Sequence, residues 1–378
     1  MEAVLEQIRK VVATGGEDVR RKAMVALQNM AASFETPDDT LHRLGHMNLQ
    51  TASVQVGINL GLFKHLAEAS GPLLVSDLAE QAKAEPQLVC KYLAAIGTVA
   101  ETGRSQYTAN HITRNLTEKV VEAGLAHYFS LISPQYQCLP DLLKQTEYKV
   151  PVDDTKTAFH LAFHTTLDPF TWFAQNPTYL ADFHAYHALR RQPDVTWISV
   201  YPVETEANGW PADQPLYVNV GGGVGHQCAQ FKEKFPNLGG RIILQDLPHS
   251  VAEALPTPGV ENMAHNMFES QPVIGAKFYH LRAVFHNHPP HRVRELLGTI
   301  KAAMRPESVL LLDEMVLPEE NVNYMASSID MTVLSAFAAM ERTEVQWTAL
   351  FEAVGLKLVK IYRYSPLTYE GVMDVRLP

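Results

Sequence analysis

Two polar stretches in the C-terminal half of the chain carry side chains whose types and spacing suit chemistry. In the first, residues 221–225 read GGGVG directly after the apolar run 216–220, and Asp246 lies at the end of the next apolar run. Glycines at a strand-to-helix turn allow positive φ and close approach of the backbone to a ligand. A carboxylate about 20 residues later can accept hydrogen bonds from two ribose hydroxyls, although GxGxG fails the GxGxxG pattern of dinucleotide sites. The glycine run alone is compatible with a structural turn, but together with Asp246 it predicts a nucleoside-type ligand other than NAD.

The second stretch, residues 281–293, reads LRAVFHNHPPHRV, which predicts a strand that runs into a histidine-rich loop. A histidine such as His286 has a pKa near neutrality, so it can take a proton from a substrate hydroxyl or donate a hydrogen bond. The alternating histidines 286 and 288 also suggest a metal site. No carboxylate or cysteine stands at ligand spacing beside them, so we predict no metal.

The composition of the chain bounds its class. Its 378 residues exceed what one compact core usually holds, and 46% hydrophobic and 19% charged residues are ordinary for globular proteins. The net charge of −10 argues against a nucleic-acid or anionic-membrane partner, since either requires a basic face. Three separated cysteines favour a reducing compartment, and we recognise neither a signal peptide nor a membrane span. We therefore expect a soluble cytoplasmic protein.

The elements that must position the two polar stretches alternate from residue 216 onward. Short apolar strands and helical stretches of this kind predict an α/β core with a doubly wound parallel sheet. The predicted strands lie at 216–220, 241–247, 276–285, 308–316 and 357–365, and the predicted helices at 226–235, 291–304 and 330–355. Each polar stretch then follows directly on a predicted strand.

The first two thirds of the chain read mainly as helices. Apolar residues at three- and four-residue spacing predict helices over 18–34 and 40–69, the second capped by Asp38 or Asp39. A Pro/Gly/Asn-rich stretch near 200–215 marks a boundary before the α/β core. We predict three parts, residues 1–120, a helical segment rich in aromatics at 121–212, and the core at 213–378.

Residues 75–113 have the outline of a winged helix-turn-helix. Ser76 and Pro86 are expected to open two helices, and a polar turn at 102–106 separates two short extended pieces. A recognition helix needs exposed basic and amide side chains, whereas the second helix here is apolar with one lysine. A nucleic-acid role is therefore disfavoured.

Several motifs across the chain resemble the S-adenosylmethionine (SAM)-dependent O-methyltransferases of plant and fungal natural-product pathways. They read YVNVGGGVGHQCAQFKEKFP, RIILQDLP, MAHNMFESQPV, FYHLRAVFHNHPP, SVLLLDEMVLPEE and WTALFEAVGLKLVKIY, in the order and spacing of that family. The resemblance covers nearly the whole chain, including ETPDDTLHRL near its start. It implies a class I, Rossmann-like methyltransferase core, an N-terminal helical, winged-helix-like dimerisation domain, bound SAM and a homodimer.

The resemblance also implies roles for single residues. The expected cofactor contacts are Asn219, Gly221, Gly223, Asp246, Asn266 and Met267, the last two flanking the adenine. His286 falls where these enzymes carry their general base. Glu314 falls where an acidic residue supports that base by holding the imidazole tautomer.

Four positions depart from the family pattern. Asn219, Asn266 and Asn287 stand where the family carries carboxylates, and His288 stands where it carries tryptophan. The exchange is either drift among isosteric polar residues or a loss of anions around the sulfonium. In the second case the charge of SAM can stabilise developing negative charge without methyl transfer. A branch of the fungal family, the pyridone-alkaloid pericyclases of which the leporin-pathway enzyme is one, behaves in this way.

Similarity to that branch implies that polar side chains hydrogen-bond the oxygens of the substrate. His127 and Arg191 would do so together with His286 and Asn287, although His127 can equally be structural and Arg191 solvent-exposed. Histidine at 286 counts against this reading, because the branch has other basic residues there. Further candidates for the substrate cavity are Phe34, Met47, Phe163, Phe170, Trp172 and Arg282, with core packing or, for Arg282, an ion pair as the alternative.

Three functions remain open at this stage. The first is a SAM-binding pericyclase that controls dehydration and a hetero-Diels–Alder or Alder-ene cyclisation of a polyketide or pyridone-alkaloid precursor. The second is O-methylation of a phenol or enol, with His286 as the base. The third is a non-catalytic SAM-binding scaffold. We favour the pericyclase from the sequence, because the three carboxamides replace carboxylates that methyl transfer usually keeps.

Overall fold

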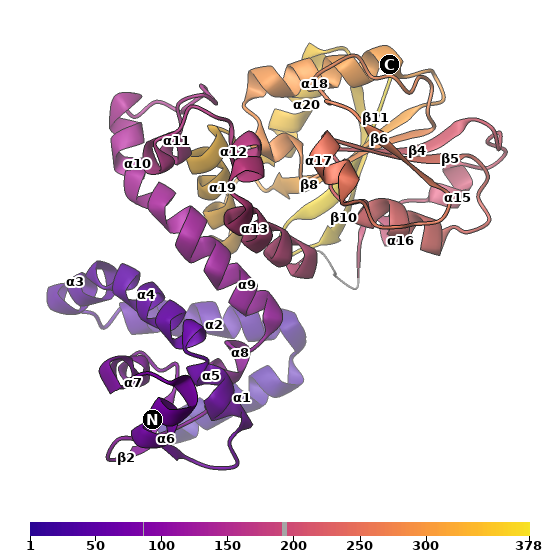
Figure 1. Ribbon diagram of the computed structural model, residues 1–378. Coiled ribbons are helices and arrows are strands. Elements are labelled where there is room, and N and C mark those ends of the chain that lie inside the picture. Colours follow the sequence, from indigo (N-terminus) through magenta and orange to yellow (C-terminus); the bar gives the residue numbers. More distant parts are fainter. Residues whose placement is uncertain (86, 191–194) are drawn as a thin grey trace. The chain divides into compact units, whose positions relative to one another are not determined.

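The computed structural model describes residues 1–85, 87–190 and 195–378. Contacts divide the chain into two compact units, Met1–Glu122 and Ala123–Pro378 (Figure 1). Each unit is considered by itself. Within the described ranges, no helix is long and apolar enough to cross a membrane.

The first unit is mainly helical, with a small sheet of order β1-β3-β2. Its helices are α1 (Glu2–Thr14), α2 (Gly16–Ala32), α3 (Pro37–Gly45), α4 (Met47–Asn59), α5 (Leu62–Glu68), α6 (Val75–Ala82), α7 (Gln87–Ala95), α8 (His111–Asn115) and α9 (Lys119–His127), which runs into the second unit. Its strands are β1 (Leu73–Leu74), β2 (Ala100–Gly103) and β3 (Gln106–Thr108). The predicted order of two helices and a hairpin over 75–113 is confirmed.

Two expectations for this unit were wrong. The single helix predicted over 40–69 is three helices, with breaks at His46 and at Gly61, which has a φ of 66°. The N-cap is neither Asp38 nor Asp39 but Thr36, whose hydroxyl accepts from the Asp39 amide while the Asp39 carboxylate accepts from the Thr36 amide. Pro37 at the first helical position suits this capping box, since it lacks the amide that would go unpaired.

The second unit begins with a helical segment whose core is aromatic. Its elements are η1 (Tyr128–Ile132), α10 (Ser133–Gln145), α11 (Ala158–Phe163), α12 (Pro169–Gln175), α13 (Pro177–Arg190), α14 (Trp197–Val200) and α15 (Val203–Glu206). Phe159, Trp172 and Phe173 are buried here with Leu131 and Ile132, and further aromatic rings pack around them. The edge-to-face and tilted ring contacts give this segment a core of its own.

The α/β core follows, and its strands carry the order β10-β11-β8-β7-β4-β5-β6. These are β4 (Pro215–Val220), β5 (Arg241–Asp246), β6 (Val260–Ala264), β7 (Phe278–Arg282), β8 (Val309–Leu317), β10 (Lys357–Ser365) and β11 (Glu370–Arg376), with β9 (Arg342–Thr343) paired to β8. The helices are α16 (His226–Lys234), α17 (Pro248–Ala252), η2 (Phe285–Asn287), α18 (Pro290–Ala303), α19 (Tyr324–Phe337) and α20 (Glu344–Ala353).

The predicted class of α/β methyltransferase core is confirmed, with three differences. The sheet is mixed, because β11 runs antiparallel between β8 and β10. Strands β6 and β11 were not predicted. The helix expected over 330–355 is two helices, α19 and α20, separated by a segment that contains β9.

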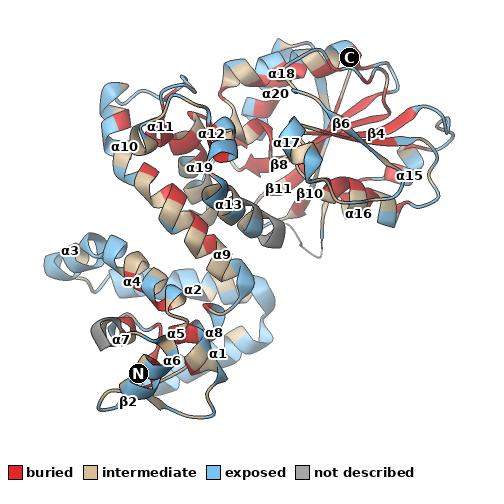
Figure 2. Ribbon diagram, viewed as in Figure 1, coloured by how far each residue is buried: buried red, intermediate tan, exposed pale blue. Residues whose placement is uncertain are grey.

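Helices cover both faces of this sheet. On one face, Leu296 and Ile300 of α18 and Trp347 of α20 are buried against the strands. On the other, Trp197 of α14 and Phe231 of α16 are buried. Figure 2 shows the resulting red, buried strands between paler helices. In a parallel sheet covered in this way, ligands bind beyond the carboxyl ends of the strands.

Candidate active site

The glycine-rich turn joins β4 to α16 at the carboxyl end of the central strand. Gly221, Gly223 and Gly225 have φ values of 65°, 60° and 93°. A Cβ at Gly221 would lie 3.0 Å from Val284 Cγ2, and one at Gly222 would lie 2.4 Å from Asn219 Oδ1. Side chains therefore cannot replace these glycines without moving their neighbours. A Cβ at Gly223 would meet nothing within 4 Å, so the turn is open on that side.

Asp246 ends the neighbouring strand β5 and faces this turn. Its Oδ2 accepts from the Gly223 amide at 2.7 Å, and its Oδ1 accepts from the Leu247 amide at 2.7 Å. A carboxylate held beside an open glycine turn suits a ribose diol, as the sequence predicted. The donor set thus fits the nucleoside part of SAM.

Asn266 and Met267 follow β6 on the same side. Asn266 Oδ1 accepts from the Phe268 amide at 3.2 Å, which fixes a local turn. Met267 Sδ would lie 3.8 Å from a Cβ at Gly221, and the Met267 carbonyl accepts from Thr299 Oγ1 at 3.2 Å. The structure therefore brings Gly221, Met267 and Val284 together, and their role toward the adenine stays a prediction.

Asn219 lies beneath the turn and is 1% exposed. Its Nδ2 donates to the His280 carbonyl at 3.3 Å, and Cys228 Sγ lies 3.9 Å from its Oδ1. These contacts support the turn from behind. The expectation that a carboxamide at 219 changes the field at the cofactor stays a prediction.

The loop after β7 carries His286 on the short helix η2. Ala283, with a φ of 51°, turns the chain out of the strand, and its amide donates to the Asp313 carbonyl at 3.0 Å. Asn287 Nδ2 donates to the Ala283 carbonyl at 3.3 Å, which closes the turn. The side chain of His286 is 20% exposed.

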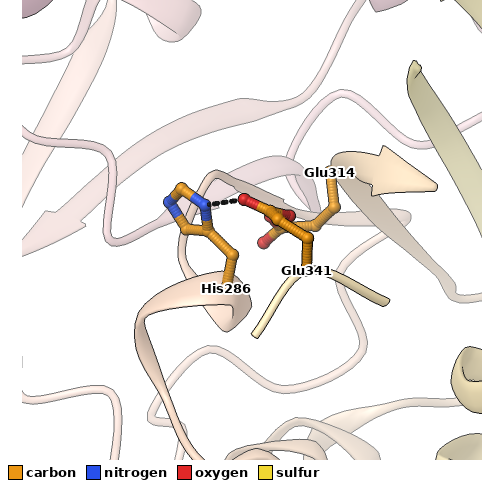
Figure 3. A group of neighbouring side chains, drawn as sticks. All are labelled: His286, Glu314 and Glu341. Atoms are coloured by element: carbon orange, nitrogen blue, oxygen red, sulfur yellow. Dashed lines mark hydrogen bonds and ion pairs between the residues drawn. The ribbon is translucent and has the colours of Figure 1, made fainter. Parts of the chain in front are cut away.

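His286 is oriented by a carboxylate that the sequence analysis missed. His286 Nδ1 lies 2.7 Å from Glu341 Oε1, and the Glu341 side chain is 1% exposed (Figure 3). A carboxylate accepts only, so Nδ1 carries the hydrogen in this pair and Nε2 carries the lone pair of the neutral ring. This is the arrangement of a general base.

Glu314, on β8, bonds the backbone beside His286. Its Oε1 accepts from the amides of Val284 and Phe285 at 2.9 and 2.8 Å, and so it holds the backbone that leads into η2. The sequence did not reveal that Glu341 accepts the hydrogen bond of the imidazole, and the supporting role of Glu314 toward the base stays a prediction. Burial raises the pKa of Glu314 to about 7; His286 opposes this rise and Glu341 adds to it.

The donor atoms of His286, Glu314 and Glu341 all lie within 4.8 Å of one another, a spacing that could also suit a metal ion. One nitrogen and one oxygen of the group already bond to each other, and the buried cation Arg342 interacts with both carboxylates. The prediction of no metal stays open to test.

His127, the last residue of α9, is buried in the aromatic segment. Its ring stacks on Tyr186 with centroids 5.4 Å apart, and Phe183 and Tyr128 meet it edge-on. Among the residues that the structure describes, Nδ1 of His127 has no hydrogen-bond partner. Burial lowers the pKa of His127 to about 4, so the ring is neutral at physiological pH.

The remaining candidates separate into three groups. Phe163, Phe170 and Trp172 pack in the aromatic core. Arg282 has 9% of its side chain exposed and its Nε lies 3.3 Å from Asp313 Oδ2, so the structure gives it an ion pair. Phe34 and Met47, in the first unit, are 75% and 51% exposed, and Arg191 lies outside the described residues. Cavity-lining roles for all of them stay predictions.

The sequence did carry a signal for the break in which Glu341 lies, although not for its contact with His286. Thr343 and Gln346 form a capping box, the Thr-x-x-Gln pattern that starts a helix. It marks the start of α20, so the chain before it had to leave the helix expected over 330–355. The charged pair Glu341–Arg342 stands in that break.

Comparison with known proteins agrees with this geometry. A family model described as an O-methyltransferase domain matches residues 213–357. The O-methyltransferase ucdC of Aspergillus ustus is 36% identical over 96% of this chain and 96% of its own length. The O-methyltransferase lepI of Aspergillus flavus is 38% identical over 90% of this chain and 89% of its own.

Solved structures are similar over the whole chain. The structure of LepI in complex with SAM is 35% identical, with a TM-score of 0.89 over 100% of this chain and 98% of that one. OxaC in complex with sinefungin and meleagrin, 21% identical, has a TM-score of 0.87 over 100% and 98%, which shows the fold alone. Together with the glycine turn and Asp246, these similarities establish SAM as the cofactor. The chain belongs to the O-methyltransferase family of fungal secondary metabolism and is an enzyme, either a SAM-dependent O-methyltransferase or a pericyclase of that fold.

Proposed function

We propose that the enzyme methylates a phenolic or enolic hydroxyl of a small natural product, with His286 as the general base. The observation that carries this proposal is the 2.7 Å hydrogen bond between His286 Nδ1 and the buried Glu341 carboxylate. An imidazole held by a carboxylate in this way is oriented for proton transfer at Nε2. A residue that only donates a hydrogen bond does not need a buried anion behind it.

In the proposed reaction, Nε2 of His286 takes the proton of the substrate hydroxyl as the oxygen attacks. Glu341 stabilises the imidazolium that forms, because its charge lies against the opposite nitrogen of the ring. When bound, SAM would supply an electrophilic methyl group on a positively charged sulfur, with S-adenosylhomocysteine as the by-product. Gly221, Gly223 and Asp246 would hold the cofactor, and Glu314 keeps the base in place through the amides of residues 284 and 285.

This proposal reverses the order of hypotheses that the sequence favoured. The pericyclase reading rested on carboxamides in place of carboxylates. Asn219 is buried beneath the turn, and Asn266 binds its own backbone turn. Meanwhile Glu314 and Glu341 place two carboxylates beside His286. The carboxamides are thus weak support for a site without methyl transfer.

The pericyclase remains the second candidate, and one observation favours it. His127 is 5% exposed with Nδ1 unpartnered among the described residues, which suits a neutral donor to a substrate oxygen. The similarity to the SAM complex of LepI, and to a structure described as that of a pericyclic reaction enzyme, supports the same reading. In that case SAM would stay intact while the substrate loses water and cyclises.

The two candidates, and the third reading of a non-catalytic scaffold, differ in their products. Purified enzyme with SAM and a panel of phenols, enols and dehydratable pyridone alcohols should give a methyl ether and an equal amount of S-adenosylhomocysteine. A product without added methyl, formed while SAM is unchanged, would establish the pericyclase instead. SAM binding with neither product would leave the scaffold.

We further propose that the enzyme is a homodimer, assembled through the first unit. Apolar side chains of α1 and α2, such as Val11, Val25 and Met30, are more than half exposed at 54%, 55% and 59%. An apolar surface of this kind usually marks an interface. The winged-helix-like description of this unit and the cytoplasmic location stay predictions.

A further inference from the structure

We propose that Arg342 is a positioning residue that fixes the turn carrying His286. It also supplies the positive charge that the buried carboxyl groups of Glu314 and Glu341 require. This inference rests on the proposed base role of His286. Arg342 is 1% exposed and is among the largest fully buried side chains that the structure describes. A guanidinium so deeply buried needs partners for its charge and its donors.

The donors of Arg342 hold the backbone on both sides of the base. Its NH1 donates to the Phe285 carbonyl at 3.1 Å, and its NH2 donates to the His288 carbonyl at 2.8 Å. The guanidinium also lies 5.1 Å from the centre of the Trp347 ring. The two guanidinium nitrogens thus bond carbonyls on both sides of His286, those of Phe285 and His288.

The same short segment also orients the ring of the base. Glu341 bonds His286 Nδ1, and the next residue, Arg342, bonds the flanking carbonyls. Arg342 is in turn fixed to the sheet, because β9 pairs with β8 at Val316. The side chain of His286 is therefore set by Glu341 and its backbone by Arg342, the first residue of the anchored strand β9.

The charge of Arg342 has several titratable neighbours. Burial lowers the pKa of Arg342, and the carboxylates of Glu314 on β8, Glu341 and Asp330 on α19 oppose this by favouring its protonated form. Burial lowers the pKa of His288 most, and the nearby Arg292, His286 and Arg342 lower it further. A cation at this position repels further positive charge, so it favours the deprotonated forms of the groups around it.

Two substitutions separate the fork from the charge. Arg342→Lys keeps the cation but loses the bidentate geometry, so kcat should fall by about 10²-fold, the cost of a misplaced base, with KM for SAM unchanged. The acid limb of its pH profile should stay where it is in the wild type. Arg342→Met should lower kcat at least as much and move the acid limb to higher pH, because the acidic group then takes up a proton more readily.

A structural role alone would give a different pattern, which a matched control tests. Arg376→Lys removes a different guanidinium fork at the end of β11, one that binds both carboxylate oxygens of Asp374 at 2.8 Å, and should leave kcat unchanged. Equal kcat in Arg342→Lys and wild type would overturn the inference. So would an acid limb that Arg342→Met does not move.

A readout without turnover separates this inference from the proposed function. In protein labelled with ¹⁵N-histidine, the His286 signal is identified by its loss in His286→Gln. Arg342→Lys should show a mixture of imidazole tautomers where the wild type shows the Nδ1–H form, with SAM affinity by calorimetry unchanged. An unaltered His286 spectrum would refute the positioning role even if the enzyme proved to be a pericyclase.

Discussion

The first two helices and the carboxyl edge of the sheet differ in how far their side chains are buried. None of the residues of α1 and α2, all of which the structure describes, is buried. At the sheet edge, by contrast, even the charged side chains of Glu314, Glu341 and Arg342 are almost fully enclosed. Glu314 and Arg342 bond backbone groups, and Glu341 bonds His286. The comparison teaches that the proposed base and its charged partners are enclosed within the second unit, whereas α1 and α2 expose apolar side chains.

The largest effect should follow from removing the base. His286→Ala should lower kcat for methyl transfer by about 10² to 10⁴, because proton removal from the acceptor then depends on water. SAM affinity and thermal stability should stay near those of the wild type. Initial rates of S-adenosylhomocysteine formation measure the effect, and an unaffected rate would exclude the base role.

Exposed apolar residues of α2 can be changed to test whether this helix forms a dimer interface. Val25→Asp combined with Met30→Glu should convert a dimer to a monomer, because each change places a charge on an exposed apolar surface. Light scattering with size exclusion would show the mass fall by half. Lys149→Asp, a change of charge at a position 78% exposed in the second unit, serves as the control. A wild type that is already monomeric would contradict the homodimer.

The buried carboxyl group of Glu314 should make the stability of the folded protein depend on pH. The pKa of Glu314 is raised to about 7 in the folded protein, so the folded state binds the proton more tightly than the unfolded state. Stability is therefore lost as pH rises from about 5 to about 8, by up to roughly 3 kcal/mol. Glu314→Gln keeps an acceptor for the two amides and should show a flatter dependence in urea unfolding. Parallel curves for the two proteins would contradict the assignment.

His127 should show the opposite dependence. Its pKa is lowered to about 4 by burial, so the unfolded state binds the proton more tightly. Stability should fall as pH drops from about 6.5 to about 4, by roughly 2 to 3 kcal/mol, and His127→Phe should remove this fall. The same variant also distinguishes the two candidate functions. A methyltransferase should keep most of its kcat, whereas a pericyclase that uses His127 as a donor should lose it.

Metal removal should have the smallest effect. Because His286 and Glu341 bond each other and Arg342 supplies the positive charge, EDTA should leave the rate of methyl transfer unchanged. Dialysed enzyme assayed with and without added Mg²⁺ or Zn²⁺ gives the measurement. A loss of rate that a divalent ion restores would show that the His286, Glu314 and Glu341 group holds a metal.

How far the site could be predicted depends on how local its signals are. The glycine turn and Asp246 were predictable, since strand, turn and the next strand follow one another within about 30 residues. His286 was predictable from the loop after β7. Glu341 was not, because its approach to His286 depends on the pairing of β9 with β8, and two residues of strand leave no periodic pattern.

The orientation of Asn219 shows a second limit. The resemblance of VNVGGG to the family motif implied a place beside the cofactor, and the side chain lies against His280 and Cys228. Alternation along a strand predicts which face a residue occupies, but a sheet covered on both faces buries either one. The mixed sheet was missed for a related reason, since β11 mixes apolar and charged residues and carries no turn signal strong enough to reveal its direction.

The pairing of β9 with β8 has a consequence for how such enzymes diversify. Helix α19 lies in the chain between Leu317 and Arg342, which belong to two paired strands. It packs against α10 and α11 through Thr332 and Ala336. It is linked to the proton-handling residues because it contacts η2 and because Asp330 accepts from the Glu341 amide and interacts with Arg342. A helix grafted here from a relative would therefore have to keep an acceptor at position 330 for the base and its partners to keep their places.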